Sequence, residues 1–326
     1  MHTPPEPVAA LRPPGGRQAD VEILLAAHNG ERWLTEQVES IRRQTYPDWR
    51  LVVRDDASSD GTLALAHELA DRDGRITVTA RPTPSGSAAR SFLELVAGSS
   101  GRYVMLADQD DVWLEDKVEV TLARMRLLES RAGDDVPALV HTDLSVVDAD
   151  LRVIEPSMVR SQMLDGAEMR LAALITQNPV TGCTVMVNRA LADLVAPPFD
   201  GVAMHDWWLV VMAAAFGGVG YVDRPTVLYR QHGANAVGAR SARTLRYKFA
   251  RALDRNGVES SLRASYAQAE AFHSRYRELL NPEQAAMLEA AATMPNRGKL
   301  ARLATLRRYG LWKNTLVKRV GQVLYG

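Results

Sequence analysis

Three carboxylates stand within four positions at Asp108, Asp110 and Asp111, directly after the apolar run 103–107. Such a run predicts a buried strand, and acids at its carboxyl end lie where open α/β sheets bind ligands. Carboxylates this close repel one another, so one is protonated or a cation is shared. Oxygen ligands suit Mg²⁺ or Mn²⁺, especially beside phosphate oxygens. We therefore predict a metal–diphosphate site. The simpler alternative, Asp111 capping a helix from Leu114, leaves two acids unexplained.

Alternating strand and helix patterns surround this stretch. Apolar runs predict strands, and segments with apolar residues at helical spacing lie between them. This alternation predicts an α/β fold with a mostly parallel, doubly wound sheet. The predicted strands cover residues 21–27, 51–54, 76–80 and 103–108, and the predicted helices cover residues 31–43, 63–70 and 90–96.

Two more polar clusters follow predicted strands. His28 and Asn29 come after the first strand, and Asp55 and Asp56 come after the second. Parallel strands end at one edge of a sheet, so these clusters and the acids near Asp108 converge on one crevice. Three polar clusters at one crevice indicate a nucleotide site.

The pattern changes after Pro137, in a half that we expect to cover the crevice and form the second substrate's site. The predicted elements are a strand at 138–143, a turn or hairpin at 145–154, a helix at 168–175, a strand at 184–187, a helix at 204–216, and short strands at 221–222 and 227–229.

The composition bears on three properties of the protein: nucleic-acid binding, disulfide bonding and membrane insertion. Lys+Arg and Asp+Glu both number 39 in 326 residues, so global charge gives no reason to expect a nucleic-acid partner. The single cysteine, Cys183, excludes an intrachain disulfide and fits a cytoplasmic location. We read it as a small buried residue. No signal-peptide pattern is seen, and the apolar stretch 209–222 is too short and glycine-rich to span a membrane, so any membrane contact is expected to be peripheral.

The last segment, from residue 241, has helical patterns and a basic end. No Asp or Glu follows Arg297, and leucines and Trp312 are interleaved with the cations. Two interpretations remain open. A basic amphipathic helix with an aromatic anchor fits an anionic membrane surface, and a helix packed on the preceding domain with a solvated basic face fits equally.

These motifs, in this order, resemble an inverting family 2 glycosyltransferase of GT-A fold. The resemblance spans residues 20–240, and within that family it is nearest to bacterial rhamnosyltransferases of cell-wall polysaccharide and O-antigen synthesis. The segments that carry it are residues 21–30, 55–62, 108–113, 182–184, 205–208 and 229–238.

The resemblance implies roles for the donor-side residues. Asp110 is expected to bind the metal directly, with Asp108 on the ribose or metal and His232 on the metal or diphosphate. Asp56 is expected to accept the N3–H of a pyrimidine, which suits an ionised carboxylate. The implied nucleotide-sugar site comprises Ala27, His28, Asn29, Glu31, Asp56, Arg90, Asp108 and Gln109.

Asp206 is the expected catalytic base. Inversion in one step requires a group that takes the acceptor hydroxyl proton while the sugar passes through an oxocarbenium-like state. His205, Trp207 and Trp208 are the expected acceptor-binding residues. The alternative for Asp206 is a cap on the helix that follows, and both roles are compatible.

We therefore expect the chain to have three parts: a disordered tail at residues 1–19, a GT-A catalytic domain at 20–240 and a basic helical extension at 241–326. The enzyme would use Mn²⁺ or Mg²⁺ to move L-rhamnose from dTDP-β-L-rhamnose to a lipid-linked glycan at the cytoplasmic membrane face. Three alternatives stay open: the same fold with a UDP- or GDP-sugar, a haloacid-dehalogenase-like phosphatase using the Asp-x-Asp-x-Val pattern from Asp108, and a non-catalytic nucleotide- or glycan-binding protein.

Overall fold

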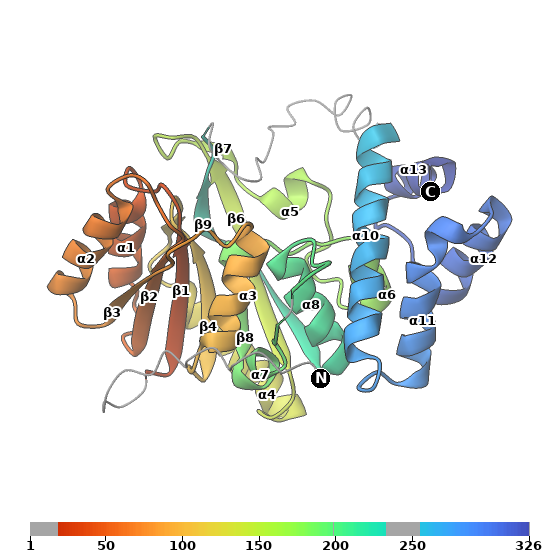
Figure 1. Cartoon of the computed structure of the whole chain (residues 1–326), viewed down its shortest axis with the longest axis horizontal. Coiled ribbons are helices and arrows are strands. Elements are labelled where there is room, and N and C mark those ends of the chain that lie inside the picture. The colour runs from red at the N-terminus through yellow and green to blue at the C-terminus, as the bar shows by residue number, and fades with distance from the viewer. Residues whose placement is uncertain (1–18, 198, 233–254, 326) are drawn as a thin grey trace.

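A computed structural model describes residues 19–197, 199–232 and 255–325 of the chain (Figure 1). The predicted disordered tail, apart from Ala19, and residues 233–238 of the rhamnosyltransferase-like segment lie outside these residues. The predicted domain boundary at 240/241 also lies outside them, so the division of the chain into 20–240 and 241–326 stays a proposal.

One mixed sheet forms the centre of the structure, with strand order β3-β2-β1-β4-β8-β6-β9-β5, and β7 pairs with β6. The first four strands in this order are mutually parallel, and β8 runs antiparallel to both β4 and β6. The strands are β1 Val21–Ala27, β2 Trp49–Asp55, β3 Ile76–Ala80, β4 Tyr103–Asp108, β5 Val112–Trp113, β6 Ala138–Val147, β7 Val153–Glu155, β8 Met186–Asn188 and β9 Gly218–Arg230.

Helices cover both faces of this sheet. Successive side chains of a strand point to opposite faces, and in β1 Leu24 enters a core with α3 and α8, whereas Ile23 and Leu25 enter another with α1 and α4. A strand buried on both faces reads as a continuous apolar run, which is why β1 and β4 could be predicted. These helices are α1 Leu34–Arg42, α2 Thr62–Arg72, α3 Ala88–Gly98, α4 Lys117–Ala132 and α8 His205–Phe216.

The second half differs from its prediction in two places. The two short strands predicted near Tyr221 and Val227 are one strand, β9, which stays paired with β6 across Pro225 because the register shifts opposite Asp143. Thr184 closes a 3-10 turn, Gly182–Thr184, and the strand after it starts at Met186. The hairpin predicted at 145–154 is confirmed as the β6–β7 turn. The short helices here are α5 Met158–Ser161, α6 Leu171–Thr176 and α7 Arg189–Asp193.

The position of helix α4 shows that the alternative prediction, in which Asp111 caps a helix from Leu114, is wrong. The helix begins at Lys117 and not at Leu114, and the strand β5 lies between Asp111 and the helix. The Asp111 carboxylate instead accepts the backbone N–H of Arg230 at 3.2 Å. Helix capping therefore does not explain Asp111.

The C-terminal helices share a core with the sheet domain. The ring of Trp208 in α8 packs edge-on against Phe272 at 5.3 Å between centroids and lies 6.0 Å from Tyr276. Figure 1 shows α10 standing beside α6 and α8, with α11 to α13 beyond it. These helices are α10 Arg255–Tyr276, α11 Pro282–Ala292, α12 Lys299–Tyr309 and α13 Leu316–Tyr325. Among the described residues, no helix combines the length and apolar character needed to cross a membrane.

We expect Trp208→Ala to lower the free energy of unfolding by about 3–5 kcal/mol, because it leaves a cavity between α8 and α10. Urea denaturation followed by circular dichroism measures this loss. Leu279→Ala, at an exposed leucine, is the matched control and is expected to change stability by no more than about 0.5 kcal/mol. Equal, small effects of both changes would mean that α10 does not depend on this contact.

Candidate active site

A cavity of about 690 Å³ opens at the carboxyl ends of β1, β2 and β4. Strand order reverses between β1 and β4, which is where open α/β sheets place their ligands. Eight of the predicted site residues line this cavity: Ala27, His28, Asp56, Asp108, Gln109, Asp110, His205 and Asp206. The structure thus brings residues from distant parts of the sequence to one place.

Gln109 ties two loops together at the donor side of the cavity. Its side-chain oxygen accepts the backbone N–H of His28 at 2.7 Å, and its amide donates to the carbonyl of the same residue at 3.0 Å. The His28 ring contacts the carbonyl oxygen of Asp56 at 2.9 Å. The loops after β1, β2 and β4 therefore form one connected wall.

Asp56 is held by the segment before α3. Its two carboxylate oxygens accept the backbone N–H and the hydroxyl of Ser85, at 2.9 and 2.6 Å, and the Arg81 guanidinium lies 3.4 Å away. Ser85 and Arg81 therefore fix the position of the Asp56 carboxylate at the wall of the cavity.

Three predicted donor-side residues are not among the described side chains that line the cavity. Asn29, with a φ of 52°, accepts the backbone N–H of Ser59 at 2.8 Å, and Glu31 accepts that of Gly61 at 3.0 Å. Arg90 is exposed and pairs with Glu94 at 2.9 Å. Asn29 and Glu31 therefore shape the neighbouring loop, because their side-chain oxygens bind its backbone, and Arg90 has the ordinary environment of a surface helix arginine.

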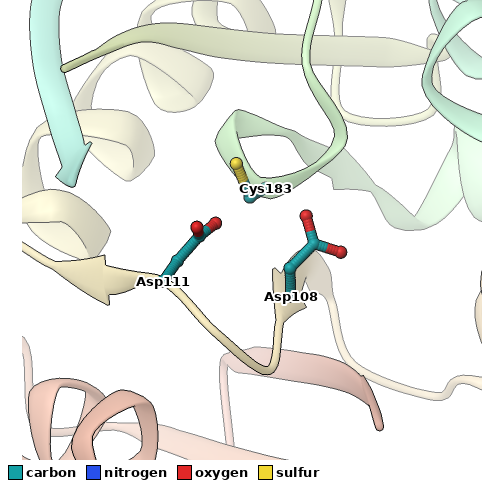
Figure 2. A group of neighbouring side chains, drawn as sticks. All are labelled: Asp108, Asp111 and Cys183. Carbon is teal, nitrogen blue, oxygen red and sulfur yellow. The ribbon is translucent and has the colours of Figure 1, made fainter. Parts of the chain in front are cut away.

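Two acids of the turn after β4 and Cys183 of the 3-10 turn Gly182–Thr184 form a group of possible ligands (Figure 2). One side-chain atom from each of Asp108, Asp111 and Cys183 lies within 4.8 Å of the others. Burial and the charge of Asp110 raise the pKa of Asp108 to about 7, and burial beside these acids also raises the pKa of Asp111 and of the Cys183 thiol. A protonated thiol is a poor ligand for Mg²⁺ or Mn²⁺, so Cys183 is a packing residue here.

The predicted metal ligands are divided by the structure. Asp110 pairs with His232, with 2.8 Å between carboxylate oxygen and ring nitrogen, whereas Asp108 lies in the group with Asp111. Carboxylate oxygens with one imidazole nitrogen are a donor set that Mn²⁺ accepts readily. Burial is the main cause of the raised pKa of Asp108, and the charges of Asp110 and Asp206 add to it, so a divalent cation bound here would favour the ionised carboxylate. The residues therefore fit a divalent metal.

Arg230, at the end of β9, binds the backbone of the acidic turn that follows β4. Its guanidinium is 1% exposed, donates to the carbonyl oxygens of Asp110 at 2.9 Å and Ala149 at 2.5 Å, and pairs with Glu36 of α1. It also lies 4.3 Å from the centre of the Trp33 ring, against which the His232 ring stacks at 5.4 Å. One side chain thus fixes the turn that carries Asp110 and the ring that supports His232.

Asp206 lies across the cavity at the start of α8. One carboxylate oxygen accepts the side-chain amide of Asn178 at 3.1 Å and the backbone N–H of Trp207 at 2.6 Å. Burial raises the pKa of Asp206 to about 6. Helix α8 begins at His205 after the N-cap residue Met204, and no described side chain caps it, so the alternative of Asp206 as a helix cap is wrong. The raised pKa makes Asp206 a stronger base than an exposed aspartate.

His205 is buried beside Asp206 and lines the cavity. Its ring stacks on Phe92 at 4.4 Å, and neither ring nitrogen has a hydrogen-bond partner among the described residues. Burial lowers its pKa to about 3, so the imidazole is neutral at physiological pH. A neutral ring has one donor and one acceptor for a ligand hydroxyl.

The two tryptophans correct the prediction for the acceptor site. Trp208 is 2% exposed and packs in the core with Phe272 and Tyr276. The indole N–H of Trp207 donates to the Leu174 carbonyl at 2.6 Å, and neither ring is among the described cavity-lining groups. Both rings therefore have no surface on which a sugar could stack.

Several cavity residues were missed from sequence. Asn178 orients Asp206 from a loop, and Met158, Leu164 and Val180 form an apolar part of the wall. Single loop residues of ordinary type give no pattern. The only signal for Asn178 would have been its place between two predicted elements.

Comparison with known proteins identifies a family domain within the chain. Residues 22–132 match the family model described as glycosyl transferase family 2. The dTDP-rhamnosyl transferase RfbG of Shigella flexneri is 27% identical over 237 residues, which cover 69% of this chain and 77% of that protein. The Escherichia coli enzyme WfgD, named as a UDP-Glc:alpha-D-GlcNAc-diphosphoundecaprenol beta-1,3-glucosyltransferase, is 25% identical over 193 residues, covering 59% and 69%.

A solved structure shows the same fold. S. aureus TarS residues 1–349, in complex with UDP-GlcNAc, superposes with a TM-score of 0.54 at 16% identity and covers 90% of this chain and 93% of that chain. The fold is therefore the GT-A fold that the family resemblance implied. The chain contains a glycosyltransferase family 2 domain, and this confirms the resemblance predicted from its motifs.

We expect Arg230→Leu to lower the free energy of unfolding by about 2–4 kcal/mol, because the buried carbonyls of Asp110 and Ala149 lose their donor. Glu36→Gln removes only the half-exposed ion pair and is expected to cost about 1 kcal/mol or less. Urea denaturation of both variants measures the difference. Equal losses would show that the ion pair, and not the carbonyl contacts, is what stabilises the turn.

Proposed function

We propose that the protein is a metal-dependent, inverting glycosyltransferase that uses a nucleotide-sugar donor. The observation that carries the proposal is the placement of Asp108 and Asp206 on one cavity, from the end of β4 and the start of α8. The two carboxylates are near enough for the charge of Asp206 to raise the pKa of Asp108. Inversion needs a leaving-group site and a base on opposite sides of the sugar, and the placement of Asp108 and Asp206 supports these two roles.

The donor side is assigned to the loops after β1, β2 and β4. The wall made by Ala27, His28, Asp56 and Gln109 would hold the nucleoside, with Asp56 accepting the N3–H of a pyrimidine. Asp108, Asp110 and His232 would hold the metal, Mn²⁺ or Mg²⁺. The metal would stabilise the negative charge on the departing diphosphate.

Asp206 is assigned the proton transfer. Its carboxylate, oriented by Asn178, takes the proton of the acceptor hydroxyl as that oxygen attacks the anomeric carbon. The bond from this carbon to the diphosphate oxygen breaks in the same step, and the pair of electrons leaves with the diphosphate. His205 is assigned to a hydroxyl of the acceptor, because its buried ring nitrogens have no hydrogen-bond partner within the described part of the chain.

For the donor sugar we propose L-rhamnose carried by dTDP. The name of the Shigella relative supports this assignment, and the apolar wall of Phe92, Met158, Leu164 and Val180 would suit the methyl group of a 6-deoxy sugar. The relative named for UDP-glucose keeps a UDP-sugar as the alternative.

For the acceptor we propose a lipid-linked glycan at the cytoplasmic face of the plasma membrane, in polysaccharide synthesis. The name of the E. coli relative, which includes a diphosphoundecaprenol substrate, supports this. The protein would reach the membrane as a peripheral protein through its basic C-terminus.

The phosphatase alternative has less support. Its nucleophilic aspartate is typical of the first strand of a domain, whereas Asp108 ends the fourth. It also gives no role to Asp206. Release of phosphate from simple phosphomonoesters would favour it. A non-catalytic binder would bind nucleotide without transferring sugar.

A binding panel tests the donor assignment. We expect calorimetry to show binding of dTDP-rhamnose that is at least about tenfold tighter with Mn²⁺ present, and weaker binding of UDP-glucose and GDP-mannose. Asp110→Asn should remove the metal effect. Tight binding of a UDP- or GDP-sugar would contradict the assignment of rhamnose as the donor sugar. Absence of nucleotide binding under every condition would contradict the proposal that the protein is a glycosyltransferase.

A conservative change tests the base. We expect Asp206→Asn to lower kcat about 10²- to 10⁴-fold with donor affinity unchanged. In the wild type, kcat should fall as the pH drops below about 6, because Asp206 then becomes protonated and cannot accept a proton. Asp193→Asn, at an exposed helix aspartate, is the control. Full turnover by Asp206→Asn would refute the assignment.

A further inference from the structure

Helix α13 exposes an apolar stripe. Leu316, Val320, Val323 and Leu324 are between 43% and 76% exposed. Their spacing of four, three and one residues places them on one side of a helix. The other side is anchored, since Gln322 is buried and its side-chain amide donates to the Leu311 carbonyl at 2.8 Å. The stripe is therefore an outward face of a helix that is already fixed to the protein.

Basic side chains of α12 border this stripe. Lys299, Arg302 and Leu303 line a small hollow together with Gln322 and Val323, so the two helices meet there. Leu300, next to Lys299, is 85% exposed. From residue 297 to residue 325 the chain has eight Lys and Arg and no Asp or Glu. The α12–α13 surface, defined as Lys299, Leu300 and Arg302 with the stripe, thus combines apolar side chains with positive charge.

This surface contains only part of the basic amphipathic segment that the sequence predicted. The anchor expected there was Trp312, but Trp312 is half-buried and packs against the main core, and Leu306 and Leu311 are buried in that core. Of the two interpretations left open from the sequence, packing on the preceding domain therefore applies to Leu306, Leu311 and Trp312. The exposed apolar groups of this surface are the stripe of α13 and Leu300 of α12, and both helices lie at the opposite end of the molecule from β3 (Figure 1).

We propose that the α12–α13 surface docks onto an anionic lipid bilayer, with the stripe entering the headgroup layer and the cations contacting lipid phosphates. Such helices bind through buried apolar area together with charge attraction. Charge argues against two other occupants. A second copy would place basic surfaces face to face, and residues 233–254 of this chain carry five Arg and Lys against one Asp. Nucleic acid would leave the apolar stripe uncovered.

The inference extends the proposed membrane site of action, and a vesicle assay that needs no donor tests it separately. The full-length protein is sedimented with vesicles of phosphatidylcholine alone or mixed in equal parts with phosphatidylglycerol. The first variant is Leu316→Ser/Val320→Ser/Val323→Ser, and the second is Lys299→Gln/Arg302→Gln. The control is Leu127→Ser/Leu279→Ser, at exposed leucines outside this surface.

We expect wild type and control to bind the mixed vesicles and not pure phosphatidylcholine. Affinity should fall at least about tenfold in the stripe variant and about fivefold per neutralised cation. Binding should also be lost in about 1 M NaCl, where screening acts within about 3 Å. Calorimetric donor affinity, the test of the transferase, should be the same in all variants.

Three results would overturn the proposal. The first is wild-type binding that is equal on both vesicle types, and the second is binding that survives the stripe substitutions. The third is absence of vesicle binding together with a dimer that the stripe substitutions dissociate, which would assign the surface to a second copy. Loss of donor binding in the wild type would instead count against the proposed function alone.

Discussion

The buried guanidinium of Arg230 is the interaction on which the site depends. It holds the carbonyl of Asp110, a carbonyl of the β6–β7 turn, and Glu36 of α1, while the Trp33 ring covers it. The acidic turn after β4 would otherwise hold three repelling carboxylates on an unsupported loop. Because the support comes from the protein, the turn is set before any ligand arrives. A preorganised charge arrangement is what stabilises a developing diphosphate at low cost.

The carboxylates on the two sides of the cavity lie in different environments. At the donor side, burial and the charges of Asp110 and Asp206 raise the pKa of Asp108, and a bound cation would offset this, whereas at the start of α8 burial raises the pKa of Asp206 to about 6. The first environment suits metal binding and the second suits proton transfer. The fold produces both by bringing β4 and α8, almost a hundred residues apart, to the same opening.

Sequence reasoning was most reliable where burial imposes a pattern. Strands β1 and β4 are buried on both faces, so their apolar runs and the polar residues that follow them could be recognised. It failed where tertiary contacts decide. The sequence His205–Trp208 does not reveal which side chains face the core, and the structure buries both tryptophans while His205 and Asp206 line the cavity. Two short strands were predicted at 221–222 and 227–229, but register shifts in the pairing with β6 keep β9 continuous across Pro225.

The central claim is a single displacement with Asp206 opposite the departing diphosphate, and the anomeric configuration of the product tests it most directly. The protein is incubated with the donor that it binds, a divalent metal and a glycan acceptor, and the one-bond carbon–proton coupling at the new anomeric centre is measured by NMR. The account predicts inversion, which from dTDP-β-L-rhamnose gives an α-linked rhamnoside. A β-linked product would contradict it, because retention requires a different sequence of steps at the anomeric carbon.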